Sequence, residues 1–338
     1  MTTTPTRADA GAIPAPTSPG ASVPASSGVS GEVLVLRALG LGDFLTALPA
    51  LRALRREFPD RRIALAAPGG LEPLARLCGA VDEVVPTRGL GVLDWPREPP
   101  EIAVNLHGKG PQSIADLLAQ HPAEVLTHRH PDFPDVDGPS WPDDVHEVDR
   151  WCLLLEQYGL TADRHELQLA RPNRSSPATG AVVVHPGAAY PARRWPVSRF
   201  AVVAHALAEQ GHQVVVTGNG DERLLAADVV RQAGLPSSAT LAGHTELHTL
   251  AALVADARLV VSGDTGIGHL ATAYGTPSVL LFGPTSPSRW GPPPDDRHVT
   301  LWAGEVGDPF GDEPSAGLLR IDPVTVFREA TALLKRWS

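Results

Sequence analysis

The amino-acid sequence predicts an α/β protein in which two Rossmann-like domains, each built on a parallel sheet, face each other across a cleft. Three observations support this fold class. The 338 residues exceed the length at which a single hydrophobic core usually stops growing. Short apolar runs alternate with amphipathic segments, which is typical of parallel sheets with crossover helices. The order of strand, glycine-rich turn and helix then restarts after residue 180, so the two halves share a layout.

The first expected domain covers residues 31–170. Its opening run GEVLVLRAL reads as a strand, and the segment 44–58 has apolar residues at helical spacing. Further strands are expected at 61–68, 82–87 and 101–108, and further helices at 71–79 and 146–159. The Pro- and Asp-rich stretch 127–145 is expected to be a loop or an insertion.

The second expected domain covers residues 180–322 and follows the linker RPNRSSPATG. Strands leading into turns are expected at 181–189, 212–222, 257–264 and 277–283, with the segment 277–283 as the last strand. Helices are expected at 198–211, 222–234, 245–257 and 267–275. The chain closes with an amphipathic helix within residues 323–338.

Composition excludes several classes of protein. The formal net charge is 28 − 38 = −10, which leaves no basic excess for non-specific binding of nucleic acid. No apolar run approaches the length of a membrane span. Residues 1–30 are rich in Ala, Pro, Ser, Thr and Gly and lack the apolar region of a secretory signal, so we expect a disordered tail.

No metal site is expected. Cys78 and Cys152 lack metal-binding spacing, and they are interpreted as buried thiols in a reducing compartment. Four histidines cluster loosely in or beside the proline-rich loop without a helical spacing, and a solvated loop is the favoured interpretation; they are His121, His128, His130 and His146.

The stretch SGDTGIGHLA, residues 262–271, follows an expected strand and opens an expected helix. Gly266, Gly268 and Ala271 fit the pattern G-x-G-x-x-A of dinucleotide sites, but no acidic residue follows the next strand until Asp295. The pattern therefore favours helix N-terminal amides that bind a diphosphate. Helix capping is the alternative for the two polar residues Asp264 and Thr265. Ligand contact is favoured because the loop lies at the carboxyl edge of the sheet.

A second stretch with this character is HPGAAYPARRWP, residues 185–196. Gly187 and Ala188 are small enough to let the backbone approach a ligand closely. Arg193 and Arg194 offer forked donors suited to phosphate, and a solvated basic pair is the alternative.

Polar residues at other strand ends are further candidates. Asp43 begins the first helix, where it is either a helix cap or a base that takes a proton from a hydroxyl. Glu222 either accepts hydrogen bonds from ribose hydroxyls or caps the next helix. The segment NLHGKGPQS is either a surface loop or a contact to an acceptor, and its candidate acceptor-binding residues are His107, Lys109 and Gln112.

The chain resembles glycosyltransferase family 9, the family of ADP-heptose–lipopolysaccharide heptosyltransferases, over roughly residues 31–335. The resemblance is carried by GLGDFLTALPALRALRREFP, by HPGAAYPARRWP and by SGDTGIGHLATAYGTPSVLLFGPTSPSRWGP. It implies the GT-B architecture, with the donor held mainly by the C-terminal domain and the last helix packed back on the N-terminal domain. It also implies inverting transfer from a nucleotide-diphosphate sugar, without an obligatory metal or other cofactor.

The resemblance also implies roles for individual residues. Asp43 falls on the proposed general base, and Arg193 falls where the family often has a lysine that neutralises the diphosphate. Glu222 falls near a nucleoside contact. The donor-binding loop corresponds to Asp264, Thr265, Gly266 and His269.

The predicted function is therefore inverting transfer of a heptose or a related hexose to a hydroxyl of a glycan, glycolipid or other acceptor. The expected partners are the nucleotide sugar and a glycan or lipid-linked acceptor, and the expected state is a cytoplasmic monomer, with peripheral contact to the inner face of the membrane as a variant. Two alternatives remain: a nucleotide-sugar epimerase or hydrolase of the same fold, and a nucleotide-sugar-binding protein without catalysis.

Overall fold

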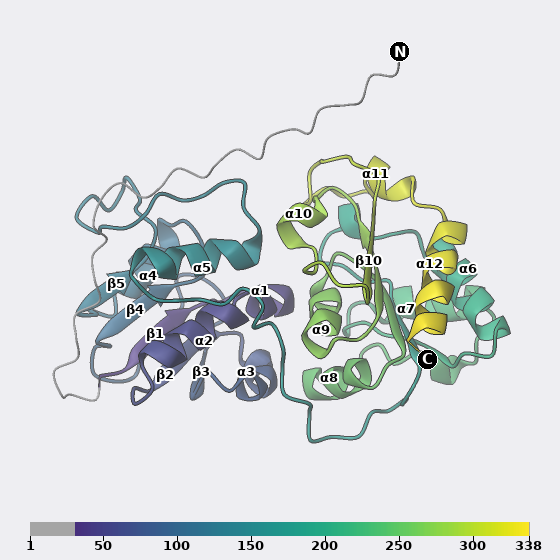
Figure 1. The fold of residues 1–338 in the computed structure, drawn as a ribbon, viewed down its shortest axis with the longest axis horizontal. Helices are drawn as coiled ribbons and strands as arrows, with labels where there is room; N and C mark the ends of the chain where they lie inside the picture. Colours follow the sequence, from purple (N-terminus) through teal and green to yellow (C-terminus); the bar gives the residue numbers. More distant parts are fainter. Residues whose placement is uncertain (1–30, 338) are drawn as a thin grey trace, which may run out of the picture.

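The computed structural model describes residues 31–337, so the expected tail at residues 1–30 lies outside the described part. Within this range the chain forms two halves, each with a five-stranded parallel sheet flanked by helices (Figure 1). The strand orders are β3-β2-β1-β4-β5 and β10-β9-β8-β6-β7. The α/β class with two Rossmann-like parallel sheets is thus confirmed.

The elements of the first half follow the expected alternation of strands and helices, with an additional strand at Glu124–Leu126 that was not expected from the sequence. Its strands are β1 (Val33–Leu36), β2 (Ile63–Ala67), β3 (Glu83–Pro86), β4 (Ile102–Asn105) and β5 (Glu124–Leu126). Its helices are α1 (Leu41–Thr46), α2 (Leu48–Glu57), α3 (Glu72–Cys78), α4 (Gln112–Leu118) and α5 (Glu147–Gln157), with a 3-10 turn at Gly69–Leu71.

The second half repeats this layout. Its strands are β6 (Val182–His185), β7 (Val214–Val216), β8 (Leu259–Gly263), β9 (Ser278–Phe282) and β10 (His298–Trp302). Its helices are α6 (Val197–Glu209), α7 (Arg223–Gln232), α8 (Leu247–Ala255), α9 (Gly266–Tyr274), α10 (Pro287–Trp290), α11 (Ala316–Leu319) and α12 (Pro323–Arg336), with 3-10 turns at Pro191–Arg193 and Ser237–Ala239.

The central strands are apolar because helices cover both faces of each sheet. Every residue of β1, β2 and β4 is buried, as is every residue of β8 and β9. The expected helix at 44–58 is divided at Ala47 into α1 and α2. Pro49 occupies the first turn of α2, where its missing N–H costs little, and it cannot continue the hydrogen-bond ladder of α1.

Three sequence expectations are corrected. The strand at 277–283 is followed by a further one, β10, whose residues are only partly buried because it lies at the sheet edge. Part of the expected loop 105–113 belongs to α4, which begins at Gln112. The last helix, α12, packs on α6, β8 and β9 of its own half, and its buried side chains belong to the core of the second half, so it does not pack back on the first half.

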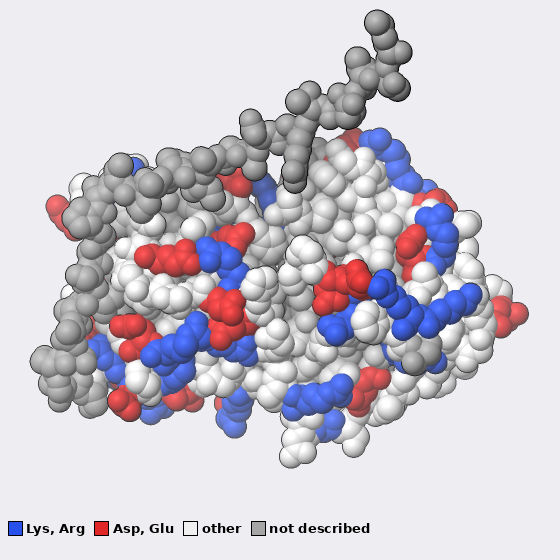
Figure 2. All heavy atoms as spheres, in the orientation of Figure 1, with Lys and Arg blue, Asp and Glu red and all other residues white. Residues whose placement is uncertain are grey.

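An apolar cluster joins the two halves. Side chains from α1, α2 and α3 share it with residues of α8 and α9, among them Leu253, Ile267 and Leu270. The closest approach between the halves is made by α1 and α9, which lie against each other in Figure 1. No helix within residues 31–337 has the length and apolar character needed to cross a bilayer. Figure 2 shows acidic and basic side chains interspersed over the face it presents.

Candidate active site

The candidate residues gather where each sheet changes its direction of growth. In the first half this switch lies between β1 and β4, and in the second half it lies between β6 and β8. Ligands of open α/β sheets bind in the crevice outside the carboxyl ends of strands at such a switch. The segment 37–43 follows β1 and leads into α1, while residues 264–269 follow β8 and begin α9. The topology therefore places both segments at switch points.

The two helix N-termini touch each other, and glycines make this contact tight. A Cβ on Gly42 would lie 3.1 Å from Cδ2 of His269 and 3.6 Å from Cα of Gly266. A Cβ on Gly266 would lie 2.8 Å from Cβ of Leu41. A side chain at Gly266 thus has no room, and the glycine is required by the approach of the first half. Asp43, next to Gly42, is brought close to the donor-loop candidates by this contact.

Asp43 is half-buried and does not occupy the cap position of α1. The cap position of α1 is Gly40, and 29% of the Asp43 side chain is exposed. Burial raises the pKa of Asp43; the Arg37 guanidinium opposes this rise, and the negative charge of Glu147 adds to it. A carboxylate whose pKa lies above the ordinary value is a better proton acceptor near neutral pH. The raised pKa suits a base, and a hydrogen bond from the Gly40 backbone also ties the carboxylate to the start of α1.

A buried network that the sequence reasoning did not single out supports Asp43. Arg37, only 1% exposed, donates from Nε to the Asp43 carbonyl oxygen at 2.7 Å, and one of its terminal nitrogens lies 3.1 Å from Oε1 of Glu147. The guanidinium also stacks over the Trp151 ring, 4.8 Å from its centre. One signal was available: Arg37 directly follows four buried strand residues, and a buried arginine requires an acidic partner.

The loop between β8 and α9 carries polar atoms without partners. Thr265 occupies the cap position of α9, but its side chain makes no capping hydrogen bond. Its Oγ1 is buried and lacks a hydrogen-bond partner among the described residues, as does Nε of Arg193. Buried polar groups are nearly always paired, so this orphaned pair marks a place for a polar ligand. The arrangement favours ligand contact over the capping alternative.

Asp264 is buried beside Arg193. Its Oδ2 lies 3.9 Å from a terminal nitrogen of Arg193, which is too far for a hydrogen bond. Burial raises the pKa of Asp264 to about 6, against the opposing charge of Arg193. The backbone at Arg193 packs closely against the end of β8, since a Cβ on Gly263 would lie 3.1 Å from the Arg193 carbonyl oxygen. Strand β8 thus sets the position of both charged residues.

Glu222 fills the space beside Gly187. A Cβ on that glycine would lie 2.1 Å from Oε1 of Glu222, while Oε2 accepts a hydrogen bond from the Asn219 N–H at 2.8 Å. Glu222 stands at the cap position of α7 without a capping hydrogen bond from its side chain. Ala188 is buried, and its carbonyl oxygen accepts a hydrogen bond from Nε of Arg194 at 2.9 Å. Arg194 therefore fixes the loop, whereas Arg193 retains an unpaired nitrogen.

His269 and Trp290 lie on the far side of the donor loop. Their rings meet edge to face with centres 6.0 Å apart. Burial lowers the pKa of His269 to about 4, so the imidazole is neutral at pH 7. A cavity of about 10 Å³ lies between Trp290 and the loop residues Asp264 and Thr265. This volume is far below that of a nucleotide pocket, so a nucleotide bound at the loop would have to lie outside this cavity.

The three acceptor-side candidates have different surroundings. Nδ1 of His107 accepts a hydrogen bond from the Ala38 N–H at 3.2 Å, which ties it to the Asp43 loop. Burial, together with the positive charge of Arg37, lowers the pKa of His107 to about 4. Lys109 and Gln112 are exposed, and Gln112 begins α4. The structure brings His107 alone of the three into contact with the residues that flank Asp43.

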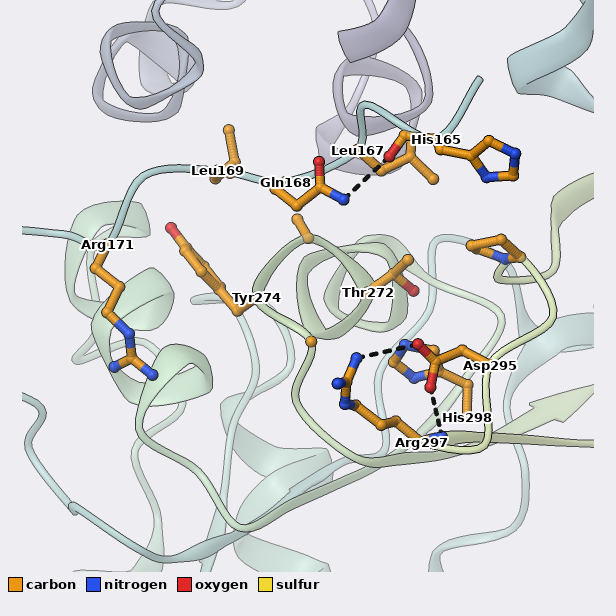
Figure 3. A pocket seen from close by; sticks show the side chains of 13 residues that line it. His165, Leu167, Gln168, Leu169, Arg171, Thr272, Tyr274, Asp295, Arg297 and His298 are labelled. Carbon is orange, nitrogen blue, oxygen red and sulfur yellow. Dashed lines mark hydrogen bonds and ion pairs between the residues drawn. The ribbon is translucent and has the colours of Figure 1, made fainter. Parts of the chain in front are cut away.

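A larger cavity lies away from these residues. It has a volume of about 470 Å³ and is lined by the segment His165–Arg171, by the end of α9 and by residues 293–298. Figure 3 shows His165 and Gln168 above α9, and Asp295 and Arg297 on the other side of the helix. Its arginines are already paired, Arg171 with Asp256 at 2.8 Å and Arg297 with Asp295 at 3.0 Å. The buried Tyr274 hydroxyl in its lining also lacks a hydrogen-bond partner among the described residues, but both arginines there are already neutralised by carboxylates.

Acidic, histidine and cysteine side chains do not gather into a metal-binding group of three or more in residues 31–337. Cys78 and Cys152 are buried free thiols, in agreement with the interpretation from sequence. His128 is packed between Trp141 and Trp151 rather than exposed in a solvated loop.

Comparisons with known proteins show which family the chain resembles. The model of glycosyltransferase family 9 (heptosyltransferase) matches residues 139–309. Lipopolysaccharide heptosyltransferase 2 of Escherichia coli K12 is 28% identical over 350 residues, which cover 90% of this chain and 98% of the relative. Lipopolysaccharide heptosyltransferase 1 of Pseudomonas aeruginosa is 36% identical over 300 residues, which cover 77% of this chain and 81% of the relative.

Solved structures show the same fold. The structure of E. coli ADP-heptose lps heptosyltransferase II has a TM-score of 0.73 at 22% identity, covering 90% of this chain and 99% of that one. A glycosyl transferase family 9 structure from Veillonella parvula has a TM-score of 0.74 at 21% identity, covering 93% of this chain and 100% of that one. These likenesses support the GT-B arrangement of two Rossmann-like domains.

Proposed function

The chain belongs to glycosyltransferase family 9, and we propose that it transfers heptose from ADP-heptose to a hydroxyl of a lipopolysaccharide-type acceptor, with inversion at the anomeric carbon. The observation that carries this proposal is the contact of Gly42 with His269 and Gly266. It brings the carboxylate next to Gly42 to the loop after β8 that holds the orphaned Oγ1 of Thr265, and the Nε of Arg193, in the segment after β6, is also orphaned. One half thus offers a base, and the other offers an anion site.

We assign the steps as a single displacement. The carboxylate of Asp43 takes the proton of the acceptor hydroxyl. The resulting oxygen bonds to the anomeric carbon from the face opposite the nucleotide, while the bond from that carbon to the diphosphate oxygen breaks. The departing diphosphate gathers negative charge, and Arg193 with the amides at Thr265 and Gly266 stabilises it where it develops.

The remaining donor candidates take supporting roles in this proposal. Asp264, Glu222 and His269 border the donor loop or the neighbouring loop, where they are suited to hydrogen bonds with sugar or ribose hydroxyls. Gly187 and Ala188 form the backbone wall of the same crevice. His107 is the acceptor-side residue that the geometry favours, since it touches the Asp43 loop. The reaction as assigned uses no obligatory metal, and the enzyme acts as a cytoplasmic monomer on an acceptor at the membrane surface.

The first test is a thermal-shift screen of the purified protein against nucleoside diphosphates and their sugar conjugates. A ligand that binds only the folded state raises Tm, and we expect ADP and ADP-heptose to give the largest rise. A larger rise with another nucleotide would show that the donor assignment is wrong.

The second test measures release of ADP from ADP-heptose with and without a lipopolysaccharide-core acceptor. Release that requires acceptor, together with a glycosylated product of inverted configuration, supports the proposal. Release of free heptose without acceptor indicates a hydrolase, and altered configuration of the intact donor indicates an epimerase. Saturable binding without turnover on any core acceptor indicates a binding protein.

A further inference from the structure

We propose that Glu147 is a positioning residue that holds the Arg37 guanidinium away from the Asp43 carboxylate, so that this carboxylate stays available as a base. The inference rests on the function proposed above, in which Asp43 takes the acceptor proton. Glu147 begins helix α5, directly after the Pro- and Asp-rich stretch 127–145, and lies far from Arg37 in the sequence.

The hydrogen bonds of Arg37 occupy both N–H groups of the terminal nitrogen that lies nearest to the Asp43 carboxylate. A guanidinium has five N–H groups in a fixed fork. Nε donates to the Asp43 carbonyl oxygen, and one terminal nitrogen donates to the Leu106 carbonyl oxygen. The other terminal nitrogen donates to Oγ1 of Thr46 at 3.2 Å and to Oε1 of Glu147 at 3.1 Å. The nearest oxygen of the Asp43 carboxylate is 3.7 Å from this second nitrogen, beyond hydrogen-bond distance.

Glu147 is itself held in place from three sides. Besides the bond from Arg37, its Oε1 accepts from Nε1 of Trp151 at 2.9 Å, and its Oε2 accepts from Nε of Arg150 at 3.1 Å. Burial raises the pKa of Glu147, but Arg37 and Arg150 outweigh burial and hold that pKa below the ordinary value. The side chain is therefore ionised at neutral pH and only 11% exposed, so it cannot turn away from Arg37 at low cost.

Near Asp43, the negative charge of Glu147 offsets the positive charge of Arg37. Arg37 comes from the end of β1 and Glu147 from α5. His269 reaches the neighbouring Gly42 from α9, and His107 approaches from the end of β4, but both imidazoles are neutral at pH 7. Without Glu147, the positive charge of Arg37 would be uncompensated and one N–H would be free to turn to Asp43.

The test uses Glu147→Gln, which keeps the size of the side chain and removes its charge. The titration of Asp43 is followed by ¹³C NMR of the carboxyl carbons in the full chain, with Asp43→Asn identifying the resonance. We expect the pKa of Asp43 to fall by about one unit or more, as for a carboxylate that gains an unopposed cation at this distance. The acid limb of the pH profile of kcat/KM should move to lower pH. The Kd for ADP should stay within about twofold of the wild-type value.

Matched variants separate this role from a general loss of structure. Asp149→Asn removes an equal charge from the same helix, where Asp149 faces Arg164 at 2.8 Å, and should leave the Asp43 titration unchanged. Glu147→Asp keeps the charge and should restore most of the pH profile. Arg150→Gln removes a cation beside Glu147 and should raise the pKa of Asp43. This change is opposite in sign to that expected for Glu147→Gln, so it tests the inference even if Glu147→Gln does not fold.

An unchanged Asp43 titration in Glu147→Gln, or a fall in Arg150→Gln, overturns the inference. Its failure can be told apart from failure of the proposed function. If Asp43→Asn retains near wild-type transfer while Glu147→Gln still shifts the Asp43 titration, the electrostatic role stands and the assignment of the base is wrong.

Discussion

Gly42 of α1 and His269 of α9 are in contact across the two halves of the molecule, with only 3.1 Å between a Cβ placed on the glycine and the imidazole Cδ2. This contact joins the N-termini of two helices that each follow a strand at a sheet switch point. The relative position of the base and the anion site therefore depends on glycines at the domain contact as much as on the residues that carry the chemistry.

Replacing Gly266 with alanine tests this dependence. The new Cβ would lie 2.8 Å from Cβ of Leu41, a backbone-proximal atom that cannot turn aside. We expect a loss of about 1–3 kcal/mol in the free energy of unfolding and a lower transfer rate. Urea denaturation and steady-state kinetics measure both effects. Gly70→Ala, with no atom within 4 Å of its new Cβ, is the control and should be near neutral. If Leu41→Gly, which removes the opposing Cβ, restores nothing when added to Gly266→Ala, steric contact is not the cause.

Asp43→Asn is expected to lower kcat by about 10²–10⁴-fold, the usual contribution of a general base. The substitution keeps the shape of the side chain, so the rise in Tm given by ADP should not change. Asp60→Asn, at an exposed turn, is the control for loss of a surface carboxylate. Transfer at near wild-type rate by the Asp43 variant would contradict the assignment.

Arg193→Ala should weaken ADP binding by about 10- to 100-fold, because hydrogen bonds to charged groups contribute roughly 1.5–3 kcal/mol. Arg193→Lys keeps the positive charge but loses the paired N–H donors of the guanidinium, and it should recover part of the affinity. Isothermal titration calorimetry gives both Kd values. Arg328→Ala changes the charge equally on the exposed face of α12, and an equal loss of affinity there would indicate a long-range charge effect rather than a diphosphate contact.

Asp264→Asn should stabilise the ligand-free protein at high pH. The folded-state pKa of about 6 exceeds the ordinary value of 3.8, so the folded state holds a proton that the unfolded state has lost between these pH values. Stability then falls as pH rises from about 4 to 6, and above pH 6 the buried carboxylate costs about 3 kcal/mol. The variant removes this cost.

Urea unfolding at pH 5 and pH 8 measures this effect of Asp264. The stability gain of the variant should be larger at pH 8 than at pH 5, and donor affinity should fall because the carboxylate is lost. Asp228→Asn, an exposed residue paired with Arg231, should show no such pH dependence. An equal gain at both pH values would mean that Asp264 does not titrate in this range.

Much of the fold could be predicted because its signals are local. The runs VLVL and LVVSG are buried on both faces, and such continuous apolar runs indicate central strands of a parallel sheet. Strand β10 was missed because an edge strand such as HVTLW needs only partial burial and carries a weaker signal. The expected packing of α12 on the first half, which the resemblance implied, was wrong, and the amphipathic pattern could not correct it because it shows that a face is buried without showing which surface covers it.

For the site, the sequence by itself determined the chemistry of the residues at the strand ends: the carboxylate of Asp43, the fork of Arg193, and the Gly-rich start of α9. Only the tertiary structure decided which of these residues meet. Arg37 and Glu147 are separated by 110 positions, and nothing in either local pattern indicates the 3.1 Å ion pair between them. The reason is physical, since hydrogen bonding and burial within one segment fix its own strand or helix, whereas ion pairs and domain contacts depend on how distant segments pack.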